Sequence, residues 1–325
     1  MVTGIGLISG GLDSILAVRV LQDQDLRIIG VAFVTPFFGS ERAEQAAEML
    51  QVELKVMDIT QVHLEMLQLP KHGYGKALNP CIDCHALMFR EAGKLMEAEG
   101  ADFLFSGEVL GERPMSQNRQ SLGVVARESG YEDFIIRPLS ALLLPETLPE
   151  REGKVDRERL LDISGRSRKP QVELAAYYGI TDYPQPAGGC LLTDGGYTRK
   201  LKELMVRNPK LSGRDAWLLR VGRHFRLDTG DKVIVGRDKN DNAQILSMKD
   251  KSDVVLDVKD YSSPIALIPH GASSEESIAK AAAVCVRYSD APRNEEVAVI
   301  YSRGGTTNTL SVKAISDREL DSIRI

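Results

Sequence analysis

SGGLDS, residues 9–14, is the stretch of sequence that decides the fold of the first half of the chain. The apolar segment Gly4–Ile8 before it predicts a short buried strand, and Ser14–Gln22 after it predicts a helix. Two adjacent glycines allow the backbone to turn sharply between these elements. A strand, a glycine turn and a helix in this order predict a loop that binds phosphate through backbone N–H groups and the helix N-terminus.

The side chains of this loop also suit a bound phosphate group. The two serines supply hydroxyl donors, and the aspartate could hold Mg²⁺ or cap the helix. A plain strand-to-helix turn with an aspartate cap is the simpler alternative. The residues that we expect to bind phosphate here are Ser9, Gly10, Gly11, Asp13 and Ser14.

Strand-type and helix-type segments alternate through the first half of the chain. The expected strands are Arg27–Thr35, Val52–Asp58, Asp102–Phe105 and Phe134–Ile136, and the expected helices are Glu41–Leu50 and Ile82–Glu99. Strands separated by helices predict βαβ units and a mainly parallel sheet.

The pattern changes after about Thr193, where shorter strands and polar turns follow. A hairpin is expected from Glu296–Ser302 and Thr309–Ile315. We therefore predict an α/β domain over residues 1–195 and a smaller α+β domain over residues 196–325.

Composition sets the class of protein. The chain has 325 residues, of which 43% are hydrophobic and 27% charged, with a net charge of −5. No apolar run is long enough to span a bilayer, and the N-terminus lacks the pattern of a secretory signal, so we expect a cytoplasmic protein without a membrane partner. Four cysteines are too few for a disulfide scaffold in a chain of this length, which favours metal or redox chemistry.

Three of the cysteines form a candidate reactive centre. Cys81 and Cys84 precede a predicted helix in a CxxC pattern, and Cys190 follows two glycines. Three thiolates would leave one iron of a cubane cluster without a protein ligand, whereas structural zinc normally takes four ligands. Three alternatives stay open: a zinc site completed by His85, a redox disulfide between the CxxC cysteines, and ordinary buried cysteines. Cys285 lies in an apolar run and is interpreted as a core residue.

The loop resembles the SGGxDS signature of the PP-loop ATP pyrophosphatase superfamily, whose fold is adenine nucleotide α-hydrolase-like. This resemblance implies that ATP binds with Mg²⁺, that a substrate oxygen attacks the α-phosphate, and that pyrophosphate leaves. The Walker sequence GxxxxGK[ST] is absent from the chain, which agrees with that chemistry. By analogy, adenine would meet backbone groups near Phe33, at the end of the second strand.

Further landmarks resemble those of bacterial tRNA 2-thiouridylases. Asn79–Cys84 is similar to their Asn-Pro-Asp-x-x-Cys stretch, and Ser106 and Gly107 are similar to the start of their Thr-Gly-His stretch. The resemblance implies that these two residues contribute to the nucleotide site. Cys84 then takes the place of the first catalytic cysteine.

The second catalytic cysteine of that family would correspond to Cys190, whereas Cys81 replaces its aspartate. A CxxC pair with a distant third cysteine resembles the iron–sulfur thiolases of the same superfamily, in which three cysteines hold a 4Fe–4S cluster. That resemblance implies Cys81, Cys84 and Cys190 as both catalytic and metal-binding residues, with Asp13 as a further catalytic residue.

Residues 199–226 form a basic stretch with nine lysines or arginines and two acids. It could neutralise RNA phosphates, with Trp217, His224 and Phe225 available to stack on bases. The alternative is a solvated helix face. The C-terminal half also loosely resembles the RNA-binding module of the NFACT family.

Other candidates have less support. His63, His72 and His270 have no partner that the sequence reveals and are interpreted as surface or packing residues. Glu108 and Glu112 follow a predicted strand and could lie at the active site.

Our leading hypothesis is an ATP-dependent tRNA sulfurtransferase that makes thiouridine. The alternatives are a PP-loop enzyme that adenylates a small molecule or a carrier protein, and a non-catalytic RNA-binding protein with zinc. The modified uridine atom, the sulfur donor, the choice between cluster and persulfide, and a homodimer are left open.

Overall fold

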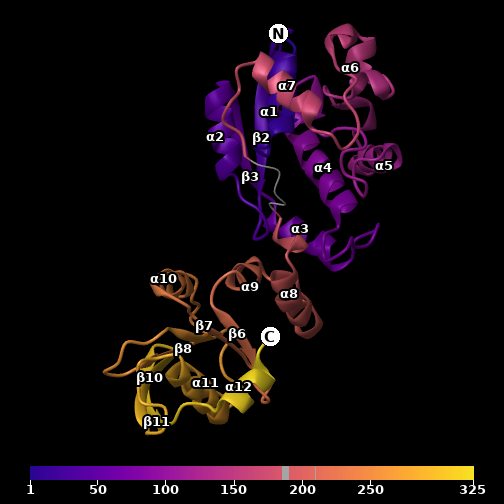
Figure 1. Cartoon of the computed structure of the whole chain (residues 1–325). Helices are drawn as coiled ribbons and strands as arrows, with labels where there is room; N and C mark the ends of the chain where they lie inside the picture. Colours follow the sequence, from indigo (N-terminus) through magenta and orange to yellow (C-terminus); the bar gives the residue numbers. More distant parts are fainter. Residues whose placement is uncertain (185–189, 209) are drawn as a thin grey trace. The chain divides into compact units, whose positions relative to one another are not determined.

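The computed structural model describes residues 1–184, 190–208 and 210–325. The chain divides into two compact units, Met1–Gly195 (unit 1) and Gly196–Ile325 (unit 2), which are drawn in Figure 1. Gly188 and Gly189, the glycines ahead of Cys190, lie outside the described residues. In the described ranges, no helix is long and apolar enough to cross a membrane.

Unit 1 contains a five-stranded sheet in which every strand pair is parallel. The strand order is β3-β2-β1-β4-β5. The strands are β1 Thr3–Leu7, β2 Arg27–Val34, β3 Glu53–Asp58, β4 Phe103–Ser106 and β5 Ile135–Ile136. The predicted parallel α/β sheet is therefore confirmed.

Helices cover both faces of this sheet. They are α1 Leu12–Gln22, α2 Glu41–Leu50, α3 Thr60–Gln68, α4 Cys81–Glu99, α5 Arg119–Ser129, α6 Leu148–Arg151 and α7 Lys169–Tyr177. Successive strand side chains point to opposite faces. Accordingly, Ile28 of β2 joins a core with residues of α1 and α2, whereas the next residue, Ile29, joins a core with residues of α4 and α5.

The strand order reverses next to β1, which pairs with β2 on one side and β4 on the other. In open α/β sheets of this kind, ligands bind outside the carboxyl ends of the strands at the reversal point. The loops that follow β1 and β4 are therefore the first place to look for a site.

Unit 2 contains a six-stranded sheet in which every pair is antiparallel, in the order β11-β10-β8-β9-β7-β6. Its strands are β6 Arg223–Arg226, β7 Lys232–Val235, β8 Val254–Val258, β9 Ala266–Ile268, β10 Val297–Arg303 and β11 Thr306–Val312. The helices are α8 Gly195–Arg207, α9 Gly213–Leu218, α10 Lys239–Ser247, α11 Glu275–Arg287 and α12 Asp317–Ile323.

The predicted hairpin is present as β10 and β11. Its second strand begins at Thr306, three residues before the expected Thr309. Gly304 and Gly305 both have positive φ, 56° and 86°, and two such residues make the tight turn that suits a twisted hairpin. Cys285 of α11 is fully buried in the core of this unit, as predicted.

The basic stretch 199–226 forms α8, α9 and β6. The suggestion that His224 and Phe225 stack on bases is wrong, because both side chains are buried, at 3% and 0% exposure. Trp217 is partly exposed, and the Arg220 guanidinium lies 4.3 Å from the centroid of its ring.

Candidate active site

The SGGLDS loop connects β1 to α1 at the carboxyl edge of the sheet. Gly10 has φ +74°, and a Cβ atom there would lie 2.3 Å from the backbone oxygen of Arg42, so no other residue fits. The Ser9 hydroxyl accepts a hydrogen bond from the Gly11 N–H at 3.3 Å, and the Ser14 hydroxyl donates one to the Gly11 carbonyl at 2.8 Å. The loop serines thus hold the backbone in place.

Helix α1 begins at Leu12, earlier than expected, and its N-cap Gly11 has no side-chain capping bond. Asp13 therefore lies in the first turn and does not cap the helix, which corrects one of the two roles expected for it. The first N–H groups of a helix lack intrahelical partners and attract anions. The end of the helix is consequently free to receive a phosphate.

The segment after β4 lies directly against this loop. A Cβ atom on Gly107 would lie 2.4 Å from the backbone nitrogen of Ser14, so the glycine allows the two backbones to approach closely. Ser106, at the end of β4, is 4% exposed, and its hydroxyl donates to Glu108 at 3.2 Å. Two segments about a hundred residues apart in sequence thus form one wall at the reversal point.

Asp13 lies in a charged and incompletely bonded environment. Burial raises the pKa of its carboxyl, while the charges of Arg168 and Arg113 and the Gln171 side chain oppose that shift. Its Oδ1 atom is buried and has no hydrogen-bond partner among the described residues. Burial and the charge of Asp13 also raise the pKa of Glu112. Two carboxylates and two arginines suit a magnesium–phosphate group.

Gln171, in α7, is fully buried beside Asp13. Within the described ranges, neither atom of its amide has a hydrogen-bond partner. Buried polar groups are almost always bonded in folded proteins. No sequence pattern indicated this residue, because the packing of α7 against α1 brings it here.

A buried ion pair supports the wall next to the loop. Glu108 accepts hydrogen bonds from Arg137 Nε at 2.9 Å and pairs with His85 Nδ1 at 2.7 Å. Burial raises the pKa of Glu108, but the charge of Arg137 and the bond and charge of His85 outweigh it and hold the pKa at about 2. Glu108 is therefore ionised and fixed in place. His85 is bonded to this carboxylate through Nδ1.

Cys81 and Cys84 lie in the first turn of α4, as their spacing predicted. Asn79 Nδ2 donates to Cys81 Sγ at 3.3 Å, and His63 Nε2 lies 3.4 Å from Cys84 Sγ. Burial lowers the pKa of His63 to about 4, so its imidazole is neutral at neutral pH.

His63 is a packing residue with a partner that the sequence did not reveal. It follows β3, and residues that follow parallel strands gather at one sheet edge, which is the signal that could have found it. The other two histidines also have partners. His72 Nε2 lies 3.7 Å from Glu128, and His270 Nε2 lies 2.7 Å from Asp215 in unit 2.

Cys190 reaches the same edge through two backbone hydrogen bonds next to it. The Leu191 N–H donates to the Phe37 carbonyl at 3.1 Å, and the Leu78 N–H donates to the Leu192 carbonyl at 3.3 Å. The first bond joins the Cys190 segment to the segment that follows β2, and the second joins it to the segment that precedes α4.

The three thiols influence one another. Burial raises the pKa of Cys84 well above its usual value, and the charges of Cys190 and Cys81 add to the shift. Burial also raises the pKa of Cys190 to about 11, again with a contribution from Cys81. All three are free thiols.

Three thiols have the donor chemistry of an iron–sulfur or zinc site. Across the described ranges, however, no three His, Cys, Asp or Glu side chains form a group that could hold a metal ion. The residues therefore fit a cluster in their chemistry and location, while their side chains are not arranged around a common point.

Phe33, expected near adenine, lies close to the end of β2 with its side chain in the core at 6% exposure. Only its backbone is therefore available at the sheet edge.

Two known families match separate parts of the chain. Residues 2–143 match the family described as "Thiamine biosynthesis protein (ThiI)", and residues 222–324 match the family described as "NFACT protein RNA binding domain". A curated relative, "Probable tRNA sulfurtransferase" of Oceanobacillus iheyensis, is 27% identical over 145 residues. The match covers 42% of this chain and 34% of the relative, so the chain spans about a third of that protein's length.

Three solved structures share parts of the architecture at low similarity. A 4-thiouridine synthetase–RNA complex with bound ATP has a TM-score of 0.40 and 22% identity, over 66% of this chain and 53% of that one. A predicted subunit of tRNA methyltransferase from Methanocaldococcus jannaschii has a TM-score of 0.36 and 15% identity, over 55% and 76%. The C-terminal part of a fibronectin/fibrinogen-binding protein from Streptococcus suis has a TM-score of 0.30 and 14% identity, over 75% and 94%.

The chain is therefore similar to the ThiI family over residues 2–143 and to NFACT RNA-binding domains over residues 222–324.

Proposed function

We propose that this chain is an ATP-dependent tRNA sulfurtransferase that converts a uridine carbonyl into a thiocarbonyl. The observation that carries the proposal is that the SGGLDS loop and three thiols occupy the carboxyl edge of one parallel sheet. The ThiI family match and the curated relative named as a probable tRNA sulfurtransferase support it. The match of residues 222–324 to RNA-binding domains supports tRNA as the partner.

In this proposal the loop binds ATP and positions its phosphates. The helix α1 N-terminus and the loop serines would bind the pyrophosphate that leaves. Asp13 and Glu112 would hold Mg²⁺, since both carboxylates lie in one charged cluster. Ser106 and Gly107 would form the opposite wall, and backbone groups near Phe33 would meet adenine.

The chemistry has two steps. The uridine carbonyl oxygen attacks the α-phosphorus, which forms an adenylated uridine and releases pyrophosphate. A sulfur nucleophile then attacks the activated carbon, and AMP leaves with the former carbonyl oxygen. Adenylation is needed because a carbonyl oxygen is a poor leaving group.

The sulfur would be handled by Cys84 and Cys190, either as a persulfide or as ligands, together with Cys81, of a 4Fe–4S cluster. A cluster held by three cysteines would supply an iron atom free to bind sulfide. His63 and Asn79 would orient the sulfur atoms of Cys84 and Cys81 through their hydrogen bonds. A cytoplasmic location follows from the proposed substrate, and a homodimer stays a prediction.

The test measures thiolated nucleosides by mass spectrometry after incubation with ATP, Mg²⁺, unmodified tRNA and sulfide under anaerobic conditions. The wild-type chain should form thiouridine and release pyrophosphate. Asp13→Asn should reduce both about 100-fold or more, as expected for loss of a group that holds the transition-state charge. Asp25→Asn, at an exposed position of the same unit, is the matched control and should keep full activity.

Two further variants separate the steps. Cys84→Ala and Cys190→Ala should stop thiolation but keep ATP binding, whereas Cys285→Ala should keep both. Full thiolation by either of the first two variants would remove that cysteine from the mechanism. Stoichiometric zinc, with no ATP cleavage by the wild type, would favour a non-catalytic RNA-binding protein instead.

A further inference from the structure

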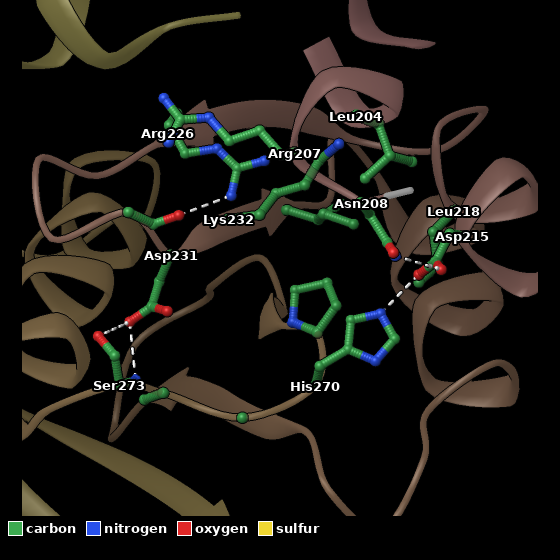
Figure 2. A pocket seen from close by; sticks show the side chains of 15 residues that line it. Leu204, Arg207, Asn208, Asp215, Leu218, Arg226, Asp231, Lys232, His270 and Ser273 are labelled. Carbon is green, nitrogen blue, oxygen red and sulfur yellow. Dashed lines mark hydrogen bonds and ion pairs between the residues drawn. The ribbon is translucent and has the colours of Figure 1, made fainter. Parts of the chain in front are cut away.

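A cavity of about 490 Å³ lies within unit 2. Its walls come from the end of α8, from α9, from β6 and β7, and from the segment after β9, as Figure 2 shows. Cavities of about 300 to 1,000 Å³ are typical of sites for small molecules and cofactors. Part of the lining, Leu204 to Leu218, precedes the residues that match the RNA-binding family.

Lys232 of β7 is the unusual member of the lining. The residue is 8% exposed, and its Nζ atom is buried without a hydrogen-bond partner in the part of the chain that the structure describes. The carboxylate paired with it, Glu203, lies 3.9 Å away and is already bonded to Arg226 Nε at 2.7 Å and Nη2 at 3.0 Å. Burying a charge is costly unless hydrogen bonds compensate it.

The two acids of the lining, Asp215 and Asp231, both accept hydrogen bonds from neighbouring residues. Asp231 accepts hydrogen bonds from the Ser273 N–H at 2.9 Å and the Ser273 hydroxyl at 2.6 Å. Asp215 accepts from the Ser212 hydroxyl at 2.7 Å and pairs with His270 Nε2 at 2.7 Å. The lining therefore contains three cationic side chains, Arg207, Arg226 and Lys232, against the two acids Asp215 and Asp231, and it favours an anionic ligand.

Two exposed groups lie beside this buried charge. Arg207, at the end of α8, has a side chain that is 58% exposed, and the His270 side chain is 57% exposed. His270 also has a left-handed backbone, φ 63°, which its N–H bond to Asp253 at 3.0 Å and its ring bond to Asp215 hold in place. In Figure 2, Lys232 and Arg226 lie along one side of the cavity, and His270 and Ser273 lie along the other.

We propose that this cavity binds one nucleotide of an RNA chain, with the phosphate bonded by Lys232 and Arg207 and the base against the His270 ring. Phosphate contacts by lysine and arginine supply most of the affinity for RNA, and unpaired bases stack on flat side chains such as histidine. The long stem of Lys232 lets its ammonium group turn toward the phosphate. Only the choice of RNA as the source of the nucleotide depends on the proposed function.

The first test compares Lys232→Met with the matched control Lys251→Met, an exposed lysine of unit 2 outside the cavity. Binding of full-length tRNA to the whole chain is measured by fluorescence anisotropy, and stability by urea unfolding. Lys232→Met should bind about tenfold more weakly, as expected for loss of a charge-assisted hydrogen bond. Its unfolding midpoint should equal or exceed that of the wild type, since a buried ammonium group that makes no hydrogen bond is removed.

These two readouts separate binding from a structural role. Affinity equal to that of Lys251→Met would overturn the proposal. A lower unfolding midpoint accompanied by weaker binding would also overturn it, because Lys232 would then be a structural partner of Glu203. Arg207→Gln, at an exposed position, gives a second route: its effect should be less than additive with that of Lys232→Met if both side chains hold one phosphate.

The last arm identifies the ligand and does not depend on thiolation. Uridine 5′-monophosphate at millimolar concentration should raise the melting temperature of the wild type and of Lys251→Met but not of Lys232→Met. An equal rise with inorganic phosphate alone would overturn the nucleotide assignment. Loss of thiolation with an intact nucleotide effect would refute the proposed function and leave the cavity assignment standing.

Discussion

Glu108 in unit 1 and Lys232 in unit 2 are both charged residues with less than a tenth of their surface exposed. Glu108 is bonded to Arg137, His85 and Ser106, whereas Lys232 Nζ has no hydrogen-bond partner among the described residues. The first charge therefore stabilises the wall of a site, and the second costs stability until a ligand binds. The partners of a buried charge, not its burial, distinguish a structural role from a binding role.

The largest expected effect on stability comes from breaking the ion pair between Glu108 and Arg137. Glu108→Gln should lower the free energy of unfolding by about 3 to 5 kcal/mol, because the buried Arg137 would lose the carboxylate with which it is paired. Hydrogen exchange by mass spectrometry, read on peptides of unit 1, measures the loss. Glu48→Gln, an exposed residue of α2, is the control and should change stability by less than about 0.5 kcal/mol. A small effect of Glu108→Gln would contradict the structural role assigned to Glu108 in the comparison with Lys232.

The second largest effect is expected in the dependence of stability on pH, which should distinguish Glu108 from Lys232. The pKa of Glu108 is lowered from 4.5 to about 2, so its contribution is present above pH 4.5 and is lost as the pH falls through about 2. The pKa of Lys232 is lowered from 10.5 to about 8, mainly by burial, so unit 2 should gain stability as the pH rises from 8 to 10.5. Each group contributes a slope of at most about 1.4 kcal/mol per pH unit.

Trp217, the one tryptophan of the chain, lies in unit 2, so its fluorescence follows the alkaline transition of that unit in urea titrations. The charged groups that act on the pKa of Lys232 are Glu203, Arg226, Lys200 and Asp215. Lys232→Met should remove the alkaline gain and leave the acid loss in unit 1 unchanged. An alkaline gain that persists in this variant would assign it to another residue.

The smallest effect is expected in unit 1, at a buried polar side chain that could form hydrogen bonds only when a ligand is bound. Gln171→Leu should raise the free energy of unfolding by about 1 kcal/mol, because a buried amide without partners is removed. It should also weaken ATP binding, measured by calorimetry, if the amide bonds the ATP-loaded site beside Asp13. Gln120→Leu, an exposed residue of α5, is the control. An unchanged affinity for ATP would show that the Gln171 amide does not bond to the ATP-loaded site. Lys232 in unit 2 would then remain the buried polar group proposed to bind a ligand.

Local sequence patterns predicted the elements of unit 1 closely. Helix α2 has the expected bounds, Glu41–Leu50, and the long helix α4 begins one residue earlier than expected and ends at Glu99 as expected. Periodicity and capping glycines depend on neighbouring residues, so the sequence displays them directly. The loop could be found for the same reason, because its residues are contiguous.

Long-range neighbours could not be predicted in the same way. The contact of His63 with Cys84 depends on how α3 packs beside α4, and no local pattern encodes that packing. His224 and Phe225 look like exposed aromatic residues in a basic stretch, yet both are buried because β6 has neighbours on both of its faces. The partners of Lys232 likewise come from elements that are separate in sequence.

The placement of Cys190 bears on how the protein is made. Two backbone hydrogen bonds, from Leu191 to Phe37 and from Leu78 to Leu192, hold its neighbours at the sheet edge. A growing chain that ends before this segment would already contain the SGGLDS loop and the CxxC pair, since domains generally fold from the N-terminus during synthesis. The third thiol joins the other two only when the ribosome has nearly completed unit 1, so in the proposed function sulfur or metal would be loaded onto all three only after that point.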